Sequence, residues 1–232
     1  MARMKITKKR LKEPDEFITL TQRAFLFVGG HLKQLAIGGG IVLALAVALF
    51  LFQMWKNKQQ DESDRRLAVA VEAYQRTASS FREVAPAEYK EALEKFEDVA
   101  ANFSGTSSGR LALLYTGNIH LKTGDFEKAI KAYETFLEKE GNERIYRSLA
   151  LEGLGYAYEG KKDFEKALGA YQKMTEVSEG PQTGSGYFNM ARCYEKLGKN
   201  EEALKNYRAF LKLSPKSQMA NGALRKISVL EK

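Results

Sequence analysis

One segment of the chain occurs four times, and this repetition constrains the fold more than any other feature. The stretch DFEKAIKAYETFL (125–137) returns as DFEKALGAYQKMT (163–175), with seven of its thirteen residues identical. Weaker copies are EYKEALEKFEDVA (88–100) and KNEEALKNYRAFL (199–211). Aligned on a central alanine, the copies are spaced 37, 38 and 36 residues apart. A period in the thirties indicates an array of stacked structural repeats.

The residue types at matching positions predict a pair of antiparallel helices in each repeat. Each copy has a small residue followed four places later by an aromatic one, and a second motif with its own small residue precedes three of the copies. Small residues let two helices approach closely, and aromatic side chains fill the space beside them. The alanines and aromatics are Ala92, Ala129, Ala167 and Ala203, with Phe96, Tyr133, Tyr171 and Tyr207. The preceding motif contains Leu113, Leu151 and Tyr187, then Gly117, Gly155 and Ala191, then His120, Tyr158 and Tyr194.

Turn residues lie between the two predicted helices of each repeat. They are Thr123-Gly124-Asp125, Lys162-Asp163 and Leu197-Gly198-Lys199. The whole pattern closely resembles the tetratricopeptide repeat across about 107–215, and Pro215 stands where that repeat often ends. It departs from the repeat by a few extra residues in loops such as 180–186. The fold class predicted is therefore an all-α solenoid, because one such hairpin cannot bury its own apolar face.

The two ends of the repeat array are less regular. A degenerate first unit, about 64–103, keeps only its second-helix motif. Its first helix is predicted from an apolar stripe: Leu67, Val71, Tyr74, Ala78 and Phe81. The last segment, 217–231, is predicted to be a capping helix with one apolar side: Ala220, Ala223, Leu224, Ile227 and Leu230.

The segment 35–56 is predicted to be a transmembrane helix. No charged residue occurs between Lys33 and Lys56, and about 20 apolar residues cross a bilayer. A cleaved signal peptide is the first alternative, but Phe52-Gln53-Met54-Trp55 is a poor cleavage site. A buried soluble helix is the second, but it would need polar residues on one face.

The positive charge is concentrated before this segment. Residues 1–60 carry ten Lys/Arg and three acidic residues, which is +7 of the chain's +8. Residues 61–232 therefore have no basic excess for nucleic acid. Eight Lys/Arg precede the apolar segment, and only Lys56 and Lys58 follow it before an acidic stretch. The positive-inside rule predicts a cytoplasmic tail (1–34) and a periplasmic domain (57–232) in a bacterial inner membrane.

Two further helices are predicted near the membrane. Residues 15–28 either form a short helix on the cytoplasmic surface, ended by Gly29-Gly30, or a weakly ordered linker. No Gly or Pro occurs between Ile41 and Ala85. One helix is therefore predicted from about Gly40 into the first hairpin, ending before Pro86.

The residue patterns of common catalytic and metal sites are not found. The two histidines, His31 and His120, belong to no cluster with metal-ligand spacing. GTSSG (105–109) lacks the lysine of a phosphate loop, so Ser107 or Ser108 is interpreted as a helix N-cap. Cys193 is either a small buried residue or a reactive thiol. We expect no enzyme activity, no cofactor and no metal.

A binding groove is implied by the resemblance rather than by the spacing. Tyr133, Tyr171 and Tyr207 are interpreted as packing residues. In the tetratricopeptide pattern, residues offset from the core stripe of each first helix line a concave groove. Carried over, these are Asn118, Glu152, Tyr156, Glu159, Phe188, Arg192 and Glu195. Leu111, Leu114 and Leu121 share the register but are too apolar to be bare, so the helix at 64–84 is expected to cover part of them.

The order of basic tail, span and repeats resembles inner-membrane YfgM-type ancillary subunits of the Sec translocon. That resemblance implies a chaperone-like adaptor for translocon subunits, a periplasmic chaperone or emerging chains. The alternative is an envelope scaffold for cell division, secretion-system or polysaccharide-export assembly. Both are protein-interaction functions that need no covalent chemistry.

Overall fold

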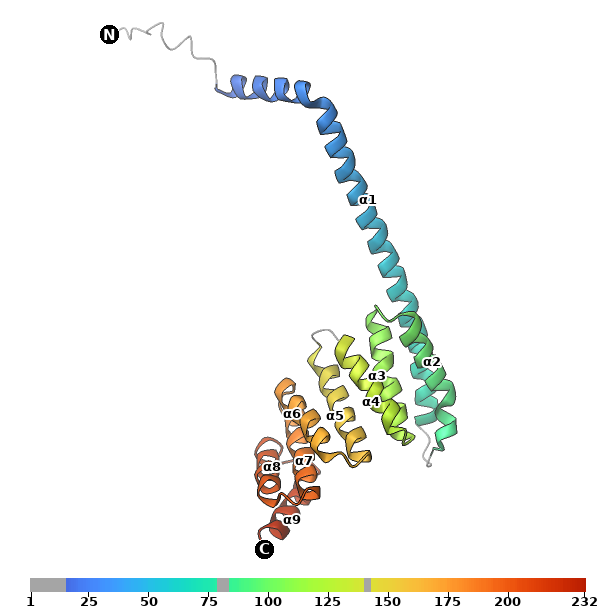
Figure 1. Cartoon of the computed structure of the whole chain (residues 1–232), viewed down its shortest axis with the longest axis vertical. Helices are drawn as coiled ribbons and strands as arrows, with labels where there is room; N and C mark the ends of the chain where they lie inside the picture. The colour runs from blue at the N-terminus through green and yellow to red at the C-terminus, as the bar shows by residue number, and fades with distance from the viewer. Residues whose placement is uncertain (1–15, 79–83, 140–142) are drawn as a thin grey trace, which may run out of the picture. The chain divides into compact units, whose positions relative to one another are not determined.

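The computed structural model describes residues 16–78, 84–139 and 143–232, with side chains from residue 21 onward, and its regular structure is helical. The chain divides into two compact units, Met1–Asn57 and Lys58–Lys232, and helix α1 (Glu16–Ala78) belongs to both. The helices that follow are η1 (Pro86–Tyr89), α2 (Lys90–Asn102), α3 (Ser107–Lys122), α4 (Phe126–Lys139), α5 (Arg144–Gly160), α6 (Phe164–Val177), α7 (Pro181–Lys196), α8 (Asn200–Leu213) and α9 (Ala220–Leu230). Figure 1 shows them in this order.

Among the described residues, α1 is the one helix long and apolar enough to cross a membrane. Its apolar side chains are exposed within the N-terminal unit, for example Leu49 at 69%. The prediction that a first helix ends at Gly29-Gly30 agrees with the structure to within one residue, because the helical backbone is interrupted directly after Gly30. The helical pattern breaks at His31 (φ −120°, ψ 15°), whose Nδ1 lies 2.9 Å from the carbonyl oxygen of Phe27. Residues 1–15 of the basic tail lie outside the described residues.

The helix predicted from about Gly40 begins earlier, directly after the break at His31, and is described as far as Ala78. Residues 79–83, which include Phe81 of the predicted stripe, lie outside the described residues. The backbone is helical through the polar junction 56–66. Straight-chain Lys, Gln, Glu and Arg residues dominate this junction, and they lose little rotamer freedom in a helix.

The C-terminal unit contains three regular helical hairpins, which we call the first repeat (α3–α4), the second repeat (α5–α6) and the third repeat (α7–α8) (Figure 1). The predicted core positions are confirmed in all of them. The alanines and aromatics at matching positions have no exposed surface: Ala129, Ala167 and Ala203, with Tyr133, Tyr171 and Tyr207. Ala92 and Phe96 occupy the same positions in α2, with exposures of 1% and 0%.

Tyr133 shows why small residues are needed at the helix crossings. A Cβ atom added to Gly117 would lie 2.6 Å from the Tyr133 ring, and one added to Gly153 would lie 2.4 Å from it. Gly117 belongs to the same repeat as Tyr133, and Gly153 belongs to the next one. The ring therefore joins two hairpins. In the second repeat, a Cβ atom added to Gly155 would lie 2.3 Å from the Tyr171 ring.

The turns inside the three repeats share one backbone conformation. Gly124 (φ 79°) and Gly198 (φ 70°) have positive φ, as the sequence pattern suggests for glycine. Lys162 holds the same position in the second repeat with φ 62°. It is a non-glycine residue in the left-handed region, which costs free energy for a residue with a Cβ atom.

The N-terminal hairpin, α1–α2, packs on α3 through a separate core. Ala70 and Ala73 of α1 contribute to this core together with Phe96 and Val99 of α2. Leu67, Val71 and Tyr74 pack against it, as predicted, but Ala78 is exposed and so does not belong to the stripe.

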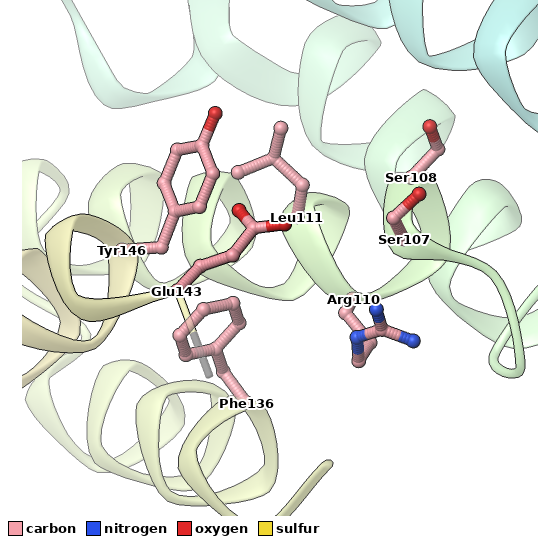
Figure 2. Close-up of a pocket in the computed structure, with 7 residues that line it drawn as sticks. All are labelled: Ser107, Ser108, Arg110, Leu111, Phe136, Glu143 and Tyr146. Carbon is pink, nitrogen blue, oxygen red and sulfur yellow. The ribbon is translucent and has the colours of Figure 1, made fainter. Parts of the chain in front are cut away.

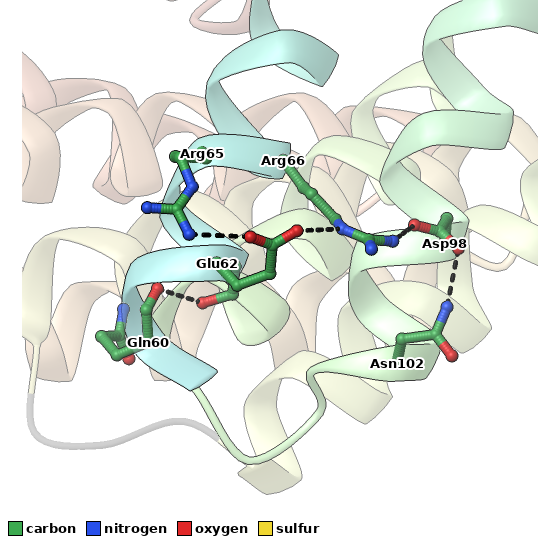
Figure 3. Close-up of polar contacts among 7 residues, drawn as sticks. Gln60, Glu62, Arg65, Arg66, Asp98 and Asn102 are labelled. Atoms are coloured by element: carbon green, nitrogen blue, oxygen red, sulfur yellow. Dashed lines mark hydrogen bonds and ion pairs between the residues drawn. The ribbon is translucent and has the colours of Figure 1, made fainter. Parts of the chain in front are cut away.

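Charged residues cover the outside of the N-terminal hairpin. Glu62 accepts hydrogen bonds from Arg65 and Arg66, at 2.8 and 2.9 Å, and Arg66 also reaches Asp98 of α2 at 3.0 Å (Figure 3). Asn102 donates to the same aspartate at 2.6 Å. These side chains are largely exposed, so solvent screening leaves each pair only a small contribution to stability.

The residue that caps α3 differs from the prediction. Thr106, not Ser107 or Ser108, is the N-cap: it has extended backbone (φ −96°, ψ 161°), and its hydroxyl accepts from the Gly109 N–H at 3.0 Å. The Ser108 hydroxyl instead donates to the carboxylate of Asp64 on α1. The serine therefore attaches the N-terminal hairpin to the first repeat.

Helix α9 follows the third repeat. Ala220 and Ala223 are buried, and Ile227 and Leu230 pack against the core that contains Tyr207 and Phe210. The fifth residue predicted for this side, Leu224, is 53% exposed, so that part of the prediction is wrong. Leu224 follows Phe188 by 36 residues and Glu152 by 72, which places it in the register of the groove residues rather than of the core.

Candidate protein-binding face

The predicted groove residues fall at equivalent positions of the first helix of each repeat. Asn118, Tyr156 and Arg192 share one position, and Leu121, Glu159 and Glu195 share the position three residues later. Residues three and four apart lie on the same face of a helix. The register therefore brings the second and third repeats' residues to one face of neighbouring helices, because α5 and α7 contact each other.

A polar network connects α5 to α7 on this face. The Arg192 guanidinium donates to Glu159 at 2.6 Å and to Asn189 at 3.1 Å. The Asn189 amide donates to the Tyr156 hydroxyl at 3.2 Å, and the Arg192 guanidinium lies 5.9 Å from the centre of the Tyr156 ring. Side chains of Glu159 and Arg192 are 12% and 38% exposed. The ion pair is half-buried and charge-assisted, so it fixes the position of both side chains.

Buried tyrosines of α6 and α8 donate hydrogen bonds to the glutamates of this face. The Tyr171 hydroxyl donates to Glu159 at 2.6 Å, and the Tyr207 hydroxyl donates to Glu195. Burial, followed by the neighbouring carboxylate, raises the pKa of both tyrosines, so both remain hydroxyl donors. These tyrosines therefore do more than pack, which the sequence did not indicate.

In the first repeat, Tyr133 donates to Asn118 at 2.7 Å instead, because the position of Glu159 is occupied there by Leu121. Asn118 is thus placed by a core tyrosine in the same way as the two glutamates. It takes no part in the network between α5 and α7, whose hydrogen bonds run through Tyr156, Glu159, Asn189 and Arg192.

Helix α9 extends this face beyond the third repeat. Lys226 donates to Glu195 at 2.7 Å, and the glutamate side chain is 19% exposed. The charge of Glu195 is therefore compensated by an ion pair, as the charge of Glu159 is by Arg192. We define the candidate binding face as seven residues: Glu152, Tyr156, Glu159, Asn189, Arg192, Glu195 and Lys226.

Glu152 differs from the other two glutamates. Its hydrogen bond from the Tyr156 hydroxyl is long, at 3.5 Å. Partial burial raises the pKa of Glu152, while hydrogen bonds from Tyr156 and Asn189 oppose this shift. In the part of the chain that the structure describes, its contacts include no cation within 4 Å. Glu152 is therefore a partly desolvated carboxylate that can still accept a charged donor.

Two of the predicted groove assignments change in detail. Phe188 packs its ring against Tyr207 and Phe210, with ring centres 5.5 and 5.2 Å away, so it is partly a core residue. Leu114 is buried in the core of the first and second repeats, and Leu111 and Leu121 pack against that core. The expectation that the helix at 64–84 covers these leucines is wrong, because they belong to the core that contains α4 and α5 residues.

Asn189 and Lys226 were missed by the sequence reasoning. Asn189 lies at a position where the other repeats have Tyr115 and Gly153, so the register alone gives no polar signal there. Lys226 lies on α9, for which only the apolar side was considered. The signal in the sequence is a charged residue on the polar side of the capping helix.

A hollow lies between the starts of α3 and α5 and the end of α4. It has a volume of about 230 Å³ and is lined by Ser107, Ser108, Arg110, Leu111, Phe136, Glu143 and Tyr146 (Figure 2). Figure 2 shows the Glu143 carboxylate on the side of Leu111 and Tyr146, while the Arg110 guanidinium points away from them. Leu111, Phe136 and Tyr146 supply the apolar part of the lining, and Ser107, Ser108, Arg110 and Glu143 make the rest polar or charged.

The remaining reactive side chains are explained by burial. Cys193 has no exposed surface, and burial raises the pKa of its thiol to about 12, which disfavours the reactive thiolate. His120 is 5% exposed, as expected for a core residue. Across residues 16–78, 84–139 and 143–232, no group of three or more His, Cys, Asp or Glu side chains has the arrangement of a metal site.

Comparison with known proteins identifies the repeats. Sequence models described as "Tetratricopeptide repeat" match residues 82–144, 116–183 and 184–217, which together span more than half of the chain. The human intraflagellar transport protein 88 homolog is 29% identical over 126 residues, covering 54% of this chain and 14% of that protein. The protein ycf37 of Cyanophora paradoxa is 27% identical over 114 residues, covering 49% of this chain and 63% of that protein.

The chain thus spans less than two thirds of the length of either curated relative. Two solved structures have a similar fold. MamA superposes with a TM-score of 0.56 at 16% identity, covering 72% of this chain and 81% of its own. The apo form of RapI gives 0.55 at 13% identity, covering 62% and 44%. At these identities the likeness shows the fold alone.

Proposed function

We propose, on the premise that the chain belongs to the tetratricopeptide-repeat family, that it is a membrane-anchored scaffold whose candidate binding face takes a segment of a partner protein. Stacked helical hairpins form extended concave surfaces that bind other proteins, and they do so without covalent chemistry. The function is protein–protein interaction, and the role of the repeats is to present several side chains to one partner.

One observation carries this proposal. Polar and aromatic side chains of α5 and α7 are joined in one hydrogen-bonded network, and an ion pair joins Glu195 of α7 to Lys226 of α9 beside it. Their supporting tyrosines are fully buried, so the network is held in a fixed arrangement before any ligand arrives. Tyr and Arg are common anchors at interfaces, and pre-organised side chains lose less entropy on binding.

Anchoring in a membrane is the second part of the proposal. The exposed apolar side chains of α1, such as Leu45 and Phe50, suit a lipid environment, and Trp55 suits its interface. Attachment to a membrane raises the local concentration of the repeats near partners at the same surface. The excess of Lys/Arg before the span supports a cytoplasmic tail and a periplasmic repeat domain in a bacterial inner membrane.

Within this class, the order of tail, span and repeats favours an ancillary role at the periplasmic side of the Sec translocon. The partners would be translocon subunits, a periplasmic chaperone or emerging chains. The alternative is an envelope scaffold for cell division, secretion-system or polysaccharide-export assembly. The two functions differ in the partner and share the same binding physics.

A photo-crosslinking experiment on native membranes tests this function. A photoreactive amino acid replaces Tyr156 on the candidate face, and a matched control replaces Glu165, which is exposed on α6. We expect crosslinks specific to position 156. Mass spectrometry then identifies the crosslinked partners. Translocon subunits would support the first role, and components of the division or export machinery would support the alternative. Equal crosslinking at the two positions would show that this face is not where partners bind.

Orientation is tested separately. Protease added to spheroplasts should remove residues 61–232, because the eight Lys/Arg before the span are expected to stay in the cytoplasm. Loss of the domain only after the membrane is permeabilised would place the repeats in the cytoplasm.

A further inference from the structure

The first turns of α5 carry apolar side chains that remain exposed. Ile145 is 63% exposed, Leu149 is 41% exposed, and Tyr146 is 36% exposed. The spacing of Ile145, Leu149, Glu152 and Tyr156 puts all four on one face of the helix. The apolar residues and the candidate binding face are therefore continuous along α5.

The hollow shown in Figure 2 has an apolar part on the side of Tyr146. Leu111 of α3 and Phe136 of α4 line it together with Tyr146 of α5. Its volume of about 230 Å³ is enough for one or two aliphatic side chains. Exposed apolar area that adjoins a hollow of this kind gains free energy when another apolar side chain covers it.

The charges beside this surface are mixed: Arg110 lines the hollow, and the glutamates of the face are only partly compensated. Glu159 is paired with Arg192, and Glu195 is paired with Lys226, at 2.6 and 2.7 Å. Glu152 lies one helical turn from Leu149 and, among the described residues, has no cation within 4 Å. The Glu143 carboxylate stands on the side of the hollow where Leu111 and Tyr146 lie. A ligand could therefore compensate the negative charge of Glu152 by bringing a positive charge close to it.

We propose that this part of the face binds a peptide segment of a partner protein in which apolar side chains are followed, about one helical turn later, by Lys or Arg. The apolar side chains cover Leu149 and enter the hollow beside Tyr146, and the cationic group pairs with Glu152. The inference rests on the proposed function and names the chemistry of its partner.

The spacing of the ligand follows from α5. Glu152 lies three positions after Leu149, which is about 4.5 Å along a helix at 1.5 Å per residue. A peptide helix lying along α5 matches this distance with an apolar residue and a cation three or four positions apart. Burial of Glu152 makes the pairing selective, because a partly desolvated carboxylate gains more from a cation than a fully hydrated one does.

The test uses the full chain in detergent and three fluorescent helical peptides at physiological ionic strength. All three have two leucines one turn apart, and the residue one turn further on is lysine, glutamine or glutamate. Fluorescence anisotropy should give an affinity for the lysine peptide about tenfold higher than for the glutamine peptide, with the glutamate peptide weaker still.

Variants assign this preference to Glu152. Glu152→Gln should bring the ratio between the lysine and glutamine peptides close to one. Glu165→Gln, at an exposed position of α6, removes the same charge and should leave the ratio at its wild-type value. Leu149→Ser should weaken all three peptides by a similar factor.

Each other outcome overturns the inference. If the peptides bind and Leu149→Ser weakens them but Glu152→Gln leaves the ratio unchanged, the charge selection is wrong and the proposed function stands. If no peptide binds and Leu149→Ser lowers the mass of the full chain by light scattering, the face is occupied by a second copy. If neither occurs, this surface has no such ligand, and the crosslinking at position 156 decides the proposed function alone.

Discussion

The first and second repeats have nearly the same core and different outer faces. In each, a fully buried tyrosine, Tyr133 or Tyr171, lies against a glycine of the preceding helix. At the position of Glu159 in the second repeat, the first repeat has Leu121, which packs against the core. The hairpin geometry therefore depends on a few small and aromatic positions, and the outer face is available for differences in function.

The tyrosine hydroxyls reflect this difference. Tyr133 donates to the neutral amide oxygen of Asn118, whereas Tyr171 donates to the Glu159 carboxylate, which also binds Arg192 of the next repeat. The core tyrosine thus positions a side chain of its own repeat in the first repeat. In the second it also supports a contact between repeats.

The largest effect is expected where the two cores are alike. Gly155→Leu should destabilise the protein by about 3 kcal/mol or more, because even a Cβ atom would lie 2.3 Å from the Tyr171 ring and the ring is fully buried. Gly117→Leu should cost a similar amount, since its Cβ atom would lie 2.6 Å from the Tyr133 ring. Urea unfolding of the full chain in detergent, followed by circular dichroism, gives both values.

Two variants of the second repeat serve as controls for that measurement. Glu165→Ala should change the free energy of unfolding by a few tenths of a kcal/mol, because Glu165 is exposed. A Cβ atom on Gly169 would have no neighbour within 4 Å, so Gly169→Ala should be neutral or slightly stabilising. Equal unfolding midpoints for Gly155→Leu and Glu165→Ala would remove Gly155 from a close crossing.

The next effect is expected where the repeats differ. Tyr171→Phe should cost about 2 kcal/mol, because a hydrogen bond to a charged acceptor is lost. Tyr133→Phe should cost about 1 kcal/mol, because its acceptor is neutral. The same unfolding measurement compares them. If the order were reversed, Glu159 would be held by Arg192 alone, and the tyrosine would have no part in placing it.

The sequence predicts the repeat cores because they depend on spacing. The alanine–aromatic pairs recur at 36 to 38 residues, and any antiparallel helix pair with that period must bury them. Most of the candidate face follows from the same register. Asn189 does not, because its role depends on a contact with Tyr156 of the preceding repeat, 33 residues away.

Local backbone conformation is the other part that the sequence did not reveal. Several hydroxyl residues stand before α3, and only the extended conformation of Thr106 decides that it is the cap. The break in α1 falls at His31 rather than at Gly29 or Gly30, because glycine permits a change of backbone conformation without fixing which neighbouring residue adopts it. In the second repeat, no glycine marks the turn at Lys162, although its φ is positive.

The turns supply a smaller effect with a matched pair. Lys162→Gly should stabilise the second repeat by up to about 1 kcal/mol, because glycine adopts positive φ without the cost of a Cβ atom. The gain is reduced by the larger backbone freedom of glycine in the unfolded chain. Gly124→Lys in the first repeat should cost a similar amount. Opposite signs for the two variants in unfolding experiments would confirm that the turns are equivalent, and equal signs would contradict it.

The smallest effect is a dependence on pH that only the first repeat should have. His120 holds the position of Tyr158 in the second repeat, where burial raises the hydroxyl pKa to about 12 and no titration occurs near neutral pH. Burial lowers the pKa of His120 below its unfolded value of about 6.5, while Asp125 and Glu97, each 3.9 Å from the ring, oppose this shift and Lys128 adds to it. The opposing carboxylates keep the net effect small.

Its sign follows from proton binding. With a lowered pKa in the folded state, the unfolded chain binds more protons near pH 6, so the contribution of His120 to stability is complete above about pH 6.5 and is lost as the pH falls below it. His120→Gln and His120→Tyr, the second of which copies the other repeat, should both remove this loss. The free energy of unfolding is measured from about pH 5 to about pH 8, and the wild-type value minus the variant value should decrease toward acid. If that difference increases toward acid instead, Asp125 and Glu97 outweigh burial, and the protonated imidazole stabilises the first repeat.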